Sequence, residues 1–110
     1  MNIDVTLNLH YTAPKEIWDR LGALYRQMPG WAAAHGENGC SWPGQWFGGN
    51  GAPQWLTASV EPGGLQLYGE LPEDVWAEWI DLFKRRAEEI VGYPVGAVED
   101  GFPCRNYDDT

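Results

Sequence analysis

Apolar and polar residues alternate along the first eleven positions of the chain. The apolar members of the pattern are Ile3, Val5, Leu7, Leu9 and Tyr11. A period of two is typical of a β-strand with one buried face, so the segment is predicted to be a strand. His10 falls on the polar side of the pattern, where we expect a solvated or hydrogen-bonded histidine.

The next pattern has the spacing of an α-helix. Thr12 is a candidate N-cap, Pro14 suits the first turn, and Pro29 with Gly30 suits the end. The apolar stripe between them consists of Ile17, Trp18, Leu21, Tyr25 and Met28. We therefore predict an amphipathic helix that ends before Pro29.

The stretch from Gly30 to Gly51 follows neither period. It contains seven glycines, together with three tryptophans and a phenylalanine. Large aromatic residues in a long loop indicate that the loop has a role. We interpret the stretch as a loop with one short strand around Gln45 to Phe47.

Two alternating segments follow, Trp55 to Glu61 and Leu65 to Glu70. The turn residues Pro62 to Gly64 join them, so the pair is predicted to be a β-hairpin. Successive side chains of a strand point to opposite faces, and the aliphatic residues occupy one face of this hairpin. The opposite face carries Trp55, Glu61, Tyr68 and Glu70.

A second and longer helical stripe begins after Pro72. Its members are Val75, Trp76, Trp79, Ile80, Phe83, Ala87, Ile90 and Val91. Glu73 and Asp74 suit the positive end of the helix dipole, and Gly92 suits the end of the helix. Val95 to Val98 is predicted to form a last strand.

These elements define a fold class. The order β-α-β-β-β-α-β predicts an α+β fold, a two-layer domain in which two helices pack on an antiparallel sheet of about four to five strands. Residues 1–98 form this single domain. Residues 99–110 are expected to be an acidic, flexible C-terminal tail.

The charge of the chain disfavours some classes of binding partner. Its 110 residues carry 16 acidic and seven basic side chains, a net charge of −9, and residues 61–110 hold twelve of the acids and four of the bases. Such a surface repels phosphate backbones, so nucleic acid and anionic membranes are poor partners. We expect neither a membrane span nor a secretory signal, because no long apolar run is present.

Catalytic and ligand-binding signatures are sparse. The sequence has no P-loop, HExxH or CxxC motif, and Gly39 to Pro43 matches a nucleophile elbow at only three positions. Cys40 and Cys104 have neither zinc spacing nor the pattern of a disulfide scaffold, so we interpret them as reduced cytoplasmic thiols. We expect no catalytic residue, no cofactor and no metal, and therefore no enzyme.

Aromatic and acidic residues provide a candidate binding surface instead. Trp55 and Tyr68 lie away from the aliphatic face of the hairpin, and exposed aromatic residues form binding hot spots. The outer face of the second helix is acidic and would steer a basic partner. The residues predicted to contact that partner are Trp55, Glu61, Tyr68, Glu70, Glu78 and Asp81.

Two segments and the overall composition resemble known bacterial proteins. The segment from Trp55 to Leu65 and the helix from Trp76 to Phe83 resemble elements of uncharacterised small bacterial proteins. Small size, acidity, richness in tryptophan and the α+β pattern together resemble bacterial immunity proteins, the cytosolic inhibitors of polymorphic or contact-dependent toxins. The resemblance implies a non-enzymatic inhibitor that occludes the active site of a protein toxin with a basic surface.

Three other functions stay open. Trp42, Trp46 and Trp55 would form the stacking platform of a small-molecule or carbohydrate-binding module. An enzyme would use His35 with Cys40, or a pair of carboxylates such as those of the hairpin. A homodimer would use the exposed patch as its own interface.

Overall fold

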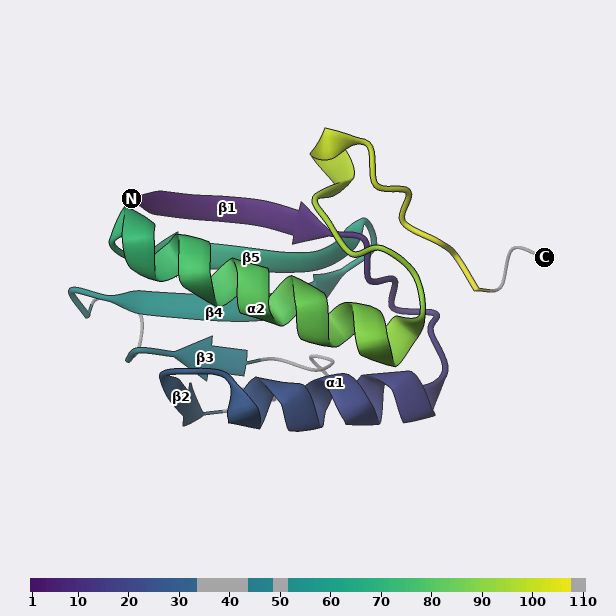
Figure 1. The fold of residues 1–110 in the computed structure, drawn as a ribbon, viewed down its shortest axis with the longest axis horizontal. Helices are drawn as coiled ribbons and strands as arrows, with labels where there is room; N and C mark the ends of the chain where they lie inside the picture. Colours follow the sequence, from purple (N-terminus) through teal and green to yellow (C-terminus); the bar gives the residue numbers. More distant parts are fainter. Residues whose placement is uncertain (34–43, 49–51, 108–110) are drawn as a thin grey trace.

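Five strands and two α-helices make up the part of the chain that the computed structural model describes, residues 1–33, 44–48 and 52–107 (Figure 1). The strands are β1 (Asn2–Leu7), β2 (Trp31–Ala33), β3 (Gly44–Trp46), β4 (Trp55–Glu61) and β5 (Gly64–Glu70), and the helices are α1 (Lys15–Gln27) and α2 (Glu73–Val91). The strands form one antiparallel sheet in the order β1-β5-β4-β3-β2. The predicted α+β fold class is confirmed.

One face of the sheet is covered by both helices (Figure 1). Directly opposed residues of antiparallel strands share a face. Leu56 lies opposite Gly69 and Ala58 lies opposite Leu67, so the aliphatic residues of the hairpin point together toward the helices. The fully buried residues on this face are Leu7, Trp46, Leu56, Ala58, Leu65 and Leu67. The predicted hairpin is confirmed, and burial fixes its register because a slip of one residue would expose this set.

The two helices bury the stripes that their spacing predicts. Their buried residues are Trp18, Leu21, Leu24 and Tyr25 in α1 and Trp79, Phe83 and Ala87 in α2. Trp46 Nε1 donates a hydrogen bond of 3.0 Å to the carbonyl of Tyr25, and Trp79 Nε1 donates one of 3.2 Å to the carbonyl of Pro29. These bonds satisfy indole donors inside the core and attach the sheet and α2 to the end of α1.

The first strand is shorter than its alternation predicts. It ends at Leu7, and the amide of Leu9 donates to the carbonyl of Leu7 at 2.8 Å, which turns the backbone. After this turn the pattern reverses, because His10 is buried and Tyr11 is exposed. The Nδ1 atom of His10 accepts a hydrogen bond of 3.2 Å from the amide of Thr12, so the hydrogen-bonded role expected for this histidine is confirmed.

The predicted strand from Val95 to Val98 is absent. Ala97 forms a single antiparallel bridge with Leu7, and the chain then enters a 3-10 helix, Val98–Asp100. The amide of Gly96 donates to the side-chain oxygen of Asn8 at 2.9 Å instead of to a backbone carbonyl. The side chain of Asn8 therefore takes the place of a backbone carbonyl as the acceptor for Gly96, and the pairing with β1 does not extend beyond the single bridge.

An additional strand, β2, occupies part of the predicted loop. Trp31 lies opposite Trp46 of β3, and their rings pack edge to face with centroids 5.7 Å apart. Three residues are too few to show a period of two, so the pattern alone did not reveal this strand.

The C-terminal segment lies against the turn that follows β1. The side-chain nitrogen of Asn8 donates to the carbonyls of Pro94 and Pro103 at 3.0 and 3.3 Å. The hydroxyl oxygen of Thr12 accepts a hydrogen bond of 2.7 Å from the amide of Tyr107, so Thr12 does not cap α1. The segment predicted to be a loose tail therefore has hydrogen-bond partners as far as Tyr107. Asn8 and Thr12 provide these partners, and because both are distant in the sequence, composition alone does not reveal them.

Candidate functional site

The face of the sheet turned away from the helices carries the candidate site. Trp55 of β4 and Tyr68 of β5 lie there, with ring centroids 6.0 Å apart and planes at 84°. They are diagonal neighbours, because Trp55 lies opposite Glu70 and Tyr68 lies opposite Thr57. Both side chains are half-buried. The structure therefore places this aromatic pair on the face that alternation predicts.

Two carboxylates border the aromatic pair. Glu70 lies opposite Trp55, and its carboxylate is 3.6 Å from the amino group of Met1. Asp4 of β1 lies opposite Tyr68. The strands β1, β4 and β5 contain no lysine or arginine. We name the following four residues the acidic aromatic patch: Asp4, Trp55, Tyr68 and Glu70.

Asp4 is the patch residue that the sequence did not identify as a candidate. Alternation assigns it to the polar side of the first strand but does not show which strand lies beside it. The pairing of β1 with β5 places Asp4 next to Tyr68, and Gln66 Nε2 donates a hydrogen bond of 3.0 Å to its carboxylate. One signal was present, since an aspartate in the middle of a strand is uncommon.

Glu61 lies at the other end of the hairpin. It stands opposite Gly64, whereas Glu70 stands opposite Trp55. Six residues of strand separate these positions, which corresponds to about 20 Å at the rise of a β-strand. The two carboxylates of a glycosidase lie much closer together, so this pair does not have the geometry of that reaction. Glu61 accepts a hydrogen bond of 3.0 Å from the hydroxyl of Ser59.

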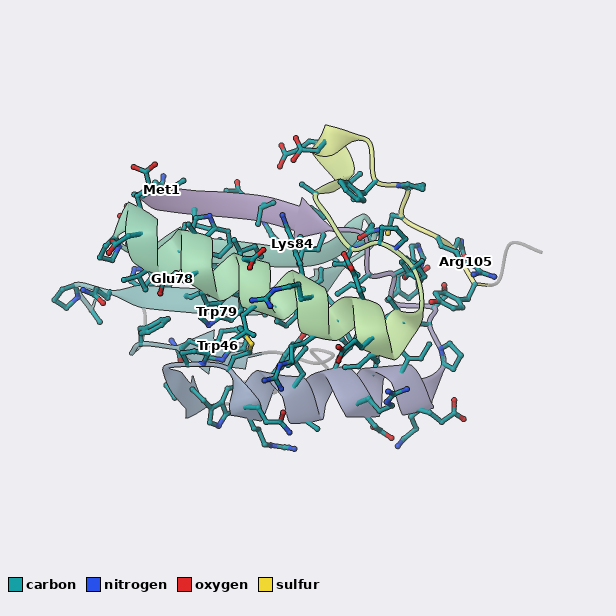
Figure 2. The ribbon with its side chains drawn as sticks, viewed as in Figure 1. Met1, Trp46, Glu78, Trp79, Lys84 and Arg105 are labelled. Atoms are coloured by element: carbon teal, nitrogen blue, oxygen red, sulfur yellow. The ribbon has the colours of Figure 1, made fainter. Side chains whose placement is uncertain are left out.

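Glu78 and Asp81 lie on α2, on the opposite side of the molecule from the acidic aromatic patch. Both are exposed, and Figure 2 shows Glu78 on the helix that covers the other face of the sheet. Asp81 forms an ion pair with Arg85 at 3.1 Å. The six predicted contact residues are therefore divided between two surfaces, and one flat interface does not reach all of them.

The tryptophan platform of a carbohydrate-binding module is not assembled as predicted. Trp46 has none of its surface exposed and packs against Trp79 with ring centroids 4.9 Å apart. Trp42 lies outside the described residues. Of the three proposed platform residues, the structure shows Trp55 alone on an open face, and it pairs there with Tyr68.

The enzymatic candidates in the glycine-rich loop, His35 and Cys40, lie outside the described residues. Cys104 is half-buried, and burial raises the pKa of its thiol, which opposes formation of the reactive thiolate. Within residues 1–33, 44–48 and 52–107, no cluster of three histidine, cysteine or carboxylate side chains has the arrangement of a metal site.

The fold and this surface define a small α+β protein whose antiparallel sheet has one helix-covered face and one open face. No helix in the described ranges has the length and apolarity to cross a membrane. Comparison of the chain with protein-family models, with curated proteins and with solved structures finds no match.

Proposed function

We propose that this chain is a non-enzymatic binding protein, an immunity protein that neutralises a toxin by covering the toxin's active site. The observation that carries the proposal is the acidic aromatic patch, which combines an edge-to-face pair of aromatic rings with two carboxylates. Partly exposed aromatic residues surrounded by charge have the composition of a binding hot spot.

The chemistry of the patch fits a basic partner. Asp4 and Glu70 are acceptors for arginine or lysine side chains, and the faces of Trp55 and Tyr68 attract the same cations. The net charge of −9 accelerates association with a positively charged protein. A toxin that acts on nucleic acid has such a surface around its active site. We propose that the chain binds this toxin in the cytoplasm.

Glu78 and Asp81 take a different role in this proposal. They lie on α2 and cannot share a flat interface with the patch. Their charges contribute to the long-range field that attracts the partner, whereas the patch makes the contacts that determine how long the complex lasts.

Capture from the native host followed by a neutralisation assay tests the proposal. The chain is immobilised, bound proteins are eluted with increasing salt, and each eluted protein is expressed alone and together with the chain. We expect one basic protein that stops growth alone and is harmless in the presence of the chain. The double variant Trp55→Ala/Tyr68→Ala is expected to lose this protection.

Tyr11→Ala is the matched control, because Tyr11 is an aromatic residue that is 55% exposed and lies outside the patch. It is expected to protect as well as the wild type does. The proposal is wrong if the captured proteins do not harm the cell, or if the patch variant protects as well as Tyr11→Ala does.

A further inference from the structure

The outer edge of β1 presents backbone groups that no described strand pairs. β1 is the first strand of the sheet and pairs with β5 on one side. The amide of Leu71 donates to the carbonyl of Met1 at 3.2 Å, which shows that the backbone of Met1 points toward β5. Backbone direction alternates along a strand, so Asn2, Asp4 and Thr6 direct their N–H groups away from the sheet.

Asn8 shows what such an outward position does when a partner is present. Its amide donates to the carbonyl of Gly96 at 3.0 Å, and Ala97 bridges to Leu7. The chain then leaves the edge through the 3-10 helix Val98–Asp100. The C-terminal segment therefore occupies the last outward position of the edge, and the positions before it have no partner strand within the described residues.

Hollows lie on both sides of this edge. The hollow on the helix side has a volume of about 230 Å³ and lies between β1 and the α2 residues Trp76, Ile80 and Lys84. Figure 2 shows Lys84 reaching from α2 toward β1. The hollow on the open face has a volume of about 530 Å³, and its lining includes Asp4 and Glu99. A strand added to the edge would send alternate side chains into the two hollows.

The two hollows select different side chains. On the helix side, Trp76 and Ile80 are half-buried apolar residues one helical turn apart, and they provide the surface that apolar side chains would contact. The lining of this hollow also includes the charged residues Lys84 and Asp100. Asp4 and Glu99 give the open side a negative charge, which fits lysine or arginine. The complementary strand is therefore one that alternates apolar and basic residues.

We propose that the edge of β1 from Asn2 to Thr6 binds an extended segment of the partner protein as an additional antiparallel or parallel strand. The apolar side chains of this segment contact Trp76 and Ile80, and its basic side chains contact Asp4 and Glu99. The inference rests on the proposed function in one respect, because it assigns how the neutralised partner is held.

A second copy of this chain fits the edge poorly. Pairing of two β1 strands around a two-fold axis at Asp4 would set two like charges directly opposite each other, which destabilises a strand pair. The net charge of −9 on each copy adds repulsion. The same carboxylate that opposes self-association attracts a basic strand.

A synthetic peptide that alternates valine and lysine, labelled with fluorescein, is the direct probe. Its binding to the full chain is followed by fluorescence anisotropy, and the site is located from amide chemical shifts. We expect saturable binding, with the largest shifts and the strongest slowing of hydrogen exchange at Asn2, Asp4 and Thr6. A peptide of the same composition with its valines and lysines in separate blocks is expected to bind at least about tenfold more weakly, because its side chains do not match the two hollows.

Two changes remove the backbone bonds without removing charge from the peptide. Methylation of the alternate peptide nitrogens that face β1 is expected to weaken binding at least about tenfold, whereas methylation of the other set has little effect. Asp4→Pro removes an outward N–H that β5 does not use, together with the carboxylate of Asp4, and proline is tolerated on an edge strand. This variant is expected to bind at least about tenfold more weakly than Asp4→Asn, which loses the same carboxylate but keeps the N–H. Glu16→Gln, at an exposed position of α1, is expected to bind like the wild type.

Equal binding of the two methylated peptides overturns the inference, and so does a shift pattern centred on β4 rather than on β1. Sedimentation that shows a dimer of the wild type, lost in Asp4→Pro, assigns the edge to a second copy and also overturns it. The methylated peptides keep the test valid even if Asp4→Pro fails to fold. If the chain neutralises a captured toxin but binds no alternating peptide, this inference alone fails; if it binds the peptide at β1 but neutralises nothing, the proposed function alone fails.

Discussion

Two tryptophans on neighbouring strands have opposite surroundings. Trp46 of β3 is fully buried and packs edge to face on Trp79 of α2. Trp55 of β4 is half-buried on the other face of the sheet, against Tyr68. The difference is one of parity along the strand, because Leu56 lies opposite Trp46 and its neighbour Trp55 must therefore face the other way.

This comparison separates stability from recognition. An aromatic residue on the helix-covered face loses nearly all contact with water and contributes to the core, whereas one on the open face gains less from folding and keeps surface for a partner. The same residue type thus has two roles that the strand register decides. Substitutions matched between the two faces test this separation.

The largest difference is expected between Trp46→Ala and Trp55→Ala. Removing the Trp46 indole leaves a cavity in the core and removes one of the two hydrogen bonds that the carbonyl of Tyr25 accepts, the other coming from the amide of Met28. The free energy of unfolding is therefore expected to fall by about 3–5 kcal/mol. Trp55→Ala removes one edge-to-face contact at a half-buried site and is expected to cost about 1 kcal/mol. Urea unfolding followed by far-ultraviolet circular dichroism measures both. Equal losses would contradict the assignment of the two faces.

The next effect concerns two asparagines beside β1. Asn8 is buried and bonds through its side chain to Pro94, Gly96 and Pro103. Asn8→Ala leaves those backbone groups without their partner and is expected to lower the free energy of unfolding by about 1–3 kcal/mol. Asn2 is exposed on the open face, and Asn2→Ala is expected to change it by less than about 0.5 kcal/mol.

Hydrogen exchange sharpens this pair of variants. The amide of Gly96 donates to Asn8 Oδ1, so its exchange is expected to accelerate in Asn8→Ala and to stay unchanged in Asn2→Ala. If Gly96 stays protected in both variants, the contact between the C-terminal segment and the turn after β1 does not depend on Asn8.

The fold was predictable where a periodic pattern is long. The stripe of α2 and the two strands of the hairpin have enough residues to display a period, and all three elements occur as predicted. β2 has three residues and shows no period. The bridge at Ala97 depends on Asn8, which is distant in the sequence, so the local pattern suggested a strand that the tertiary contact prevents.

The candidate site was predictable only in part, for a related reason. Alternation within one hairpin places Trp55, Tyr68 and Glu70 on one face without any knowledge of the sheet. It does not reveal that β1 pairs with β5, so the contribution of Asp4 became visible only with the strand order. Alternation likewise does not relate the hairpin to α2, and this is why Glu78 and Asp81 were grouped with residues on the opposite surface.

A smaller effect is expected from two tyrosine hydroxyls. In the described part of the chain, the buried hydroxyl of Tyr25 has no hydrogen-bond partner. Tyr25→Phe removes this cost and is expected to raise the free energy of unfolding by about 0.5–1 kcal/mol. Tyr68→Phe on the open face is expected to leave it within about 0.3 kcal/mol of the wild type.

The pH dependence of the free energy of unfolding is expected to differ between Tyr25→Phe and the wild type. Burial raises the pKa of Tyr25 above its ordinary value, so the folded state favours the neutral phenol. This contribution is fully present below about pH 10 and is lost as the pH rises further, because the unfolded chain ionises first. Tyr25→Phe is therefore expected to lose stability less steeply in alkaline solution, with the remaining slope including Tyr93, whose pKa burial also raises. An alkaline slope identical to that of the wild type would contradict the burial of Tyr25.

The smallest effect on stability, and the most direct test of which surface binds, comes from two charge reversals. Glu70 pairs with the amino group of Met1 and Asp81 pairs with Arg85, in both cases at exposed positions. Exposed ion pairs contribute little, so Glu70→Lys and Asp81→Lys are each expected to change the free energy of unfolding by less than about 0.5 kcal/mol.

Their effects on a captured partner are expected to differ. Both reversals change the net charge equally and weaken long-range attraction alike. Only Glu70 belongs to the acidic aromatic patch, so only Glu70→Lys is expected to shorten the lifetime of the complex, because dissociation depends on contacts that are buried on binding. Dissociation rates measured by surface plasmon resonance at two salt concentrations separate the two contributions. A faster dissociation for Asp81→Lys alone would move the interface from the open face of the sheet to α2.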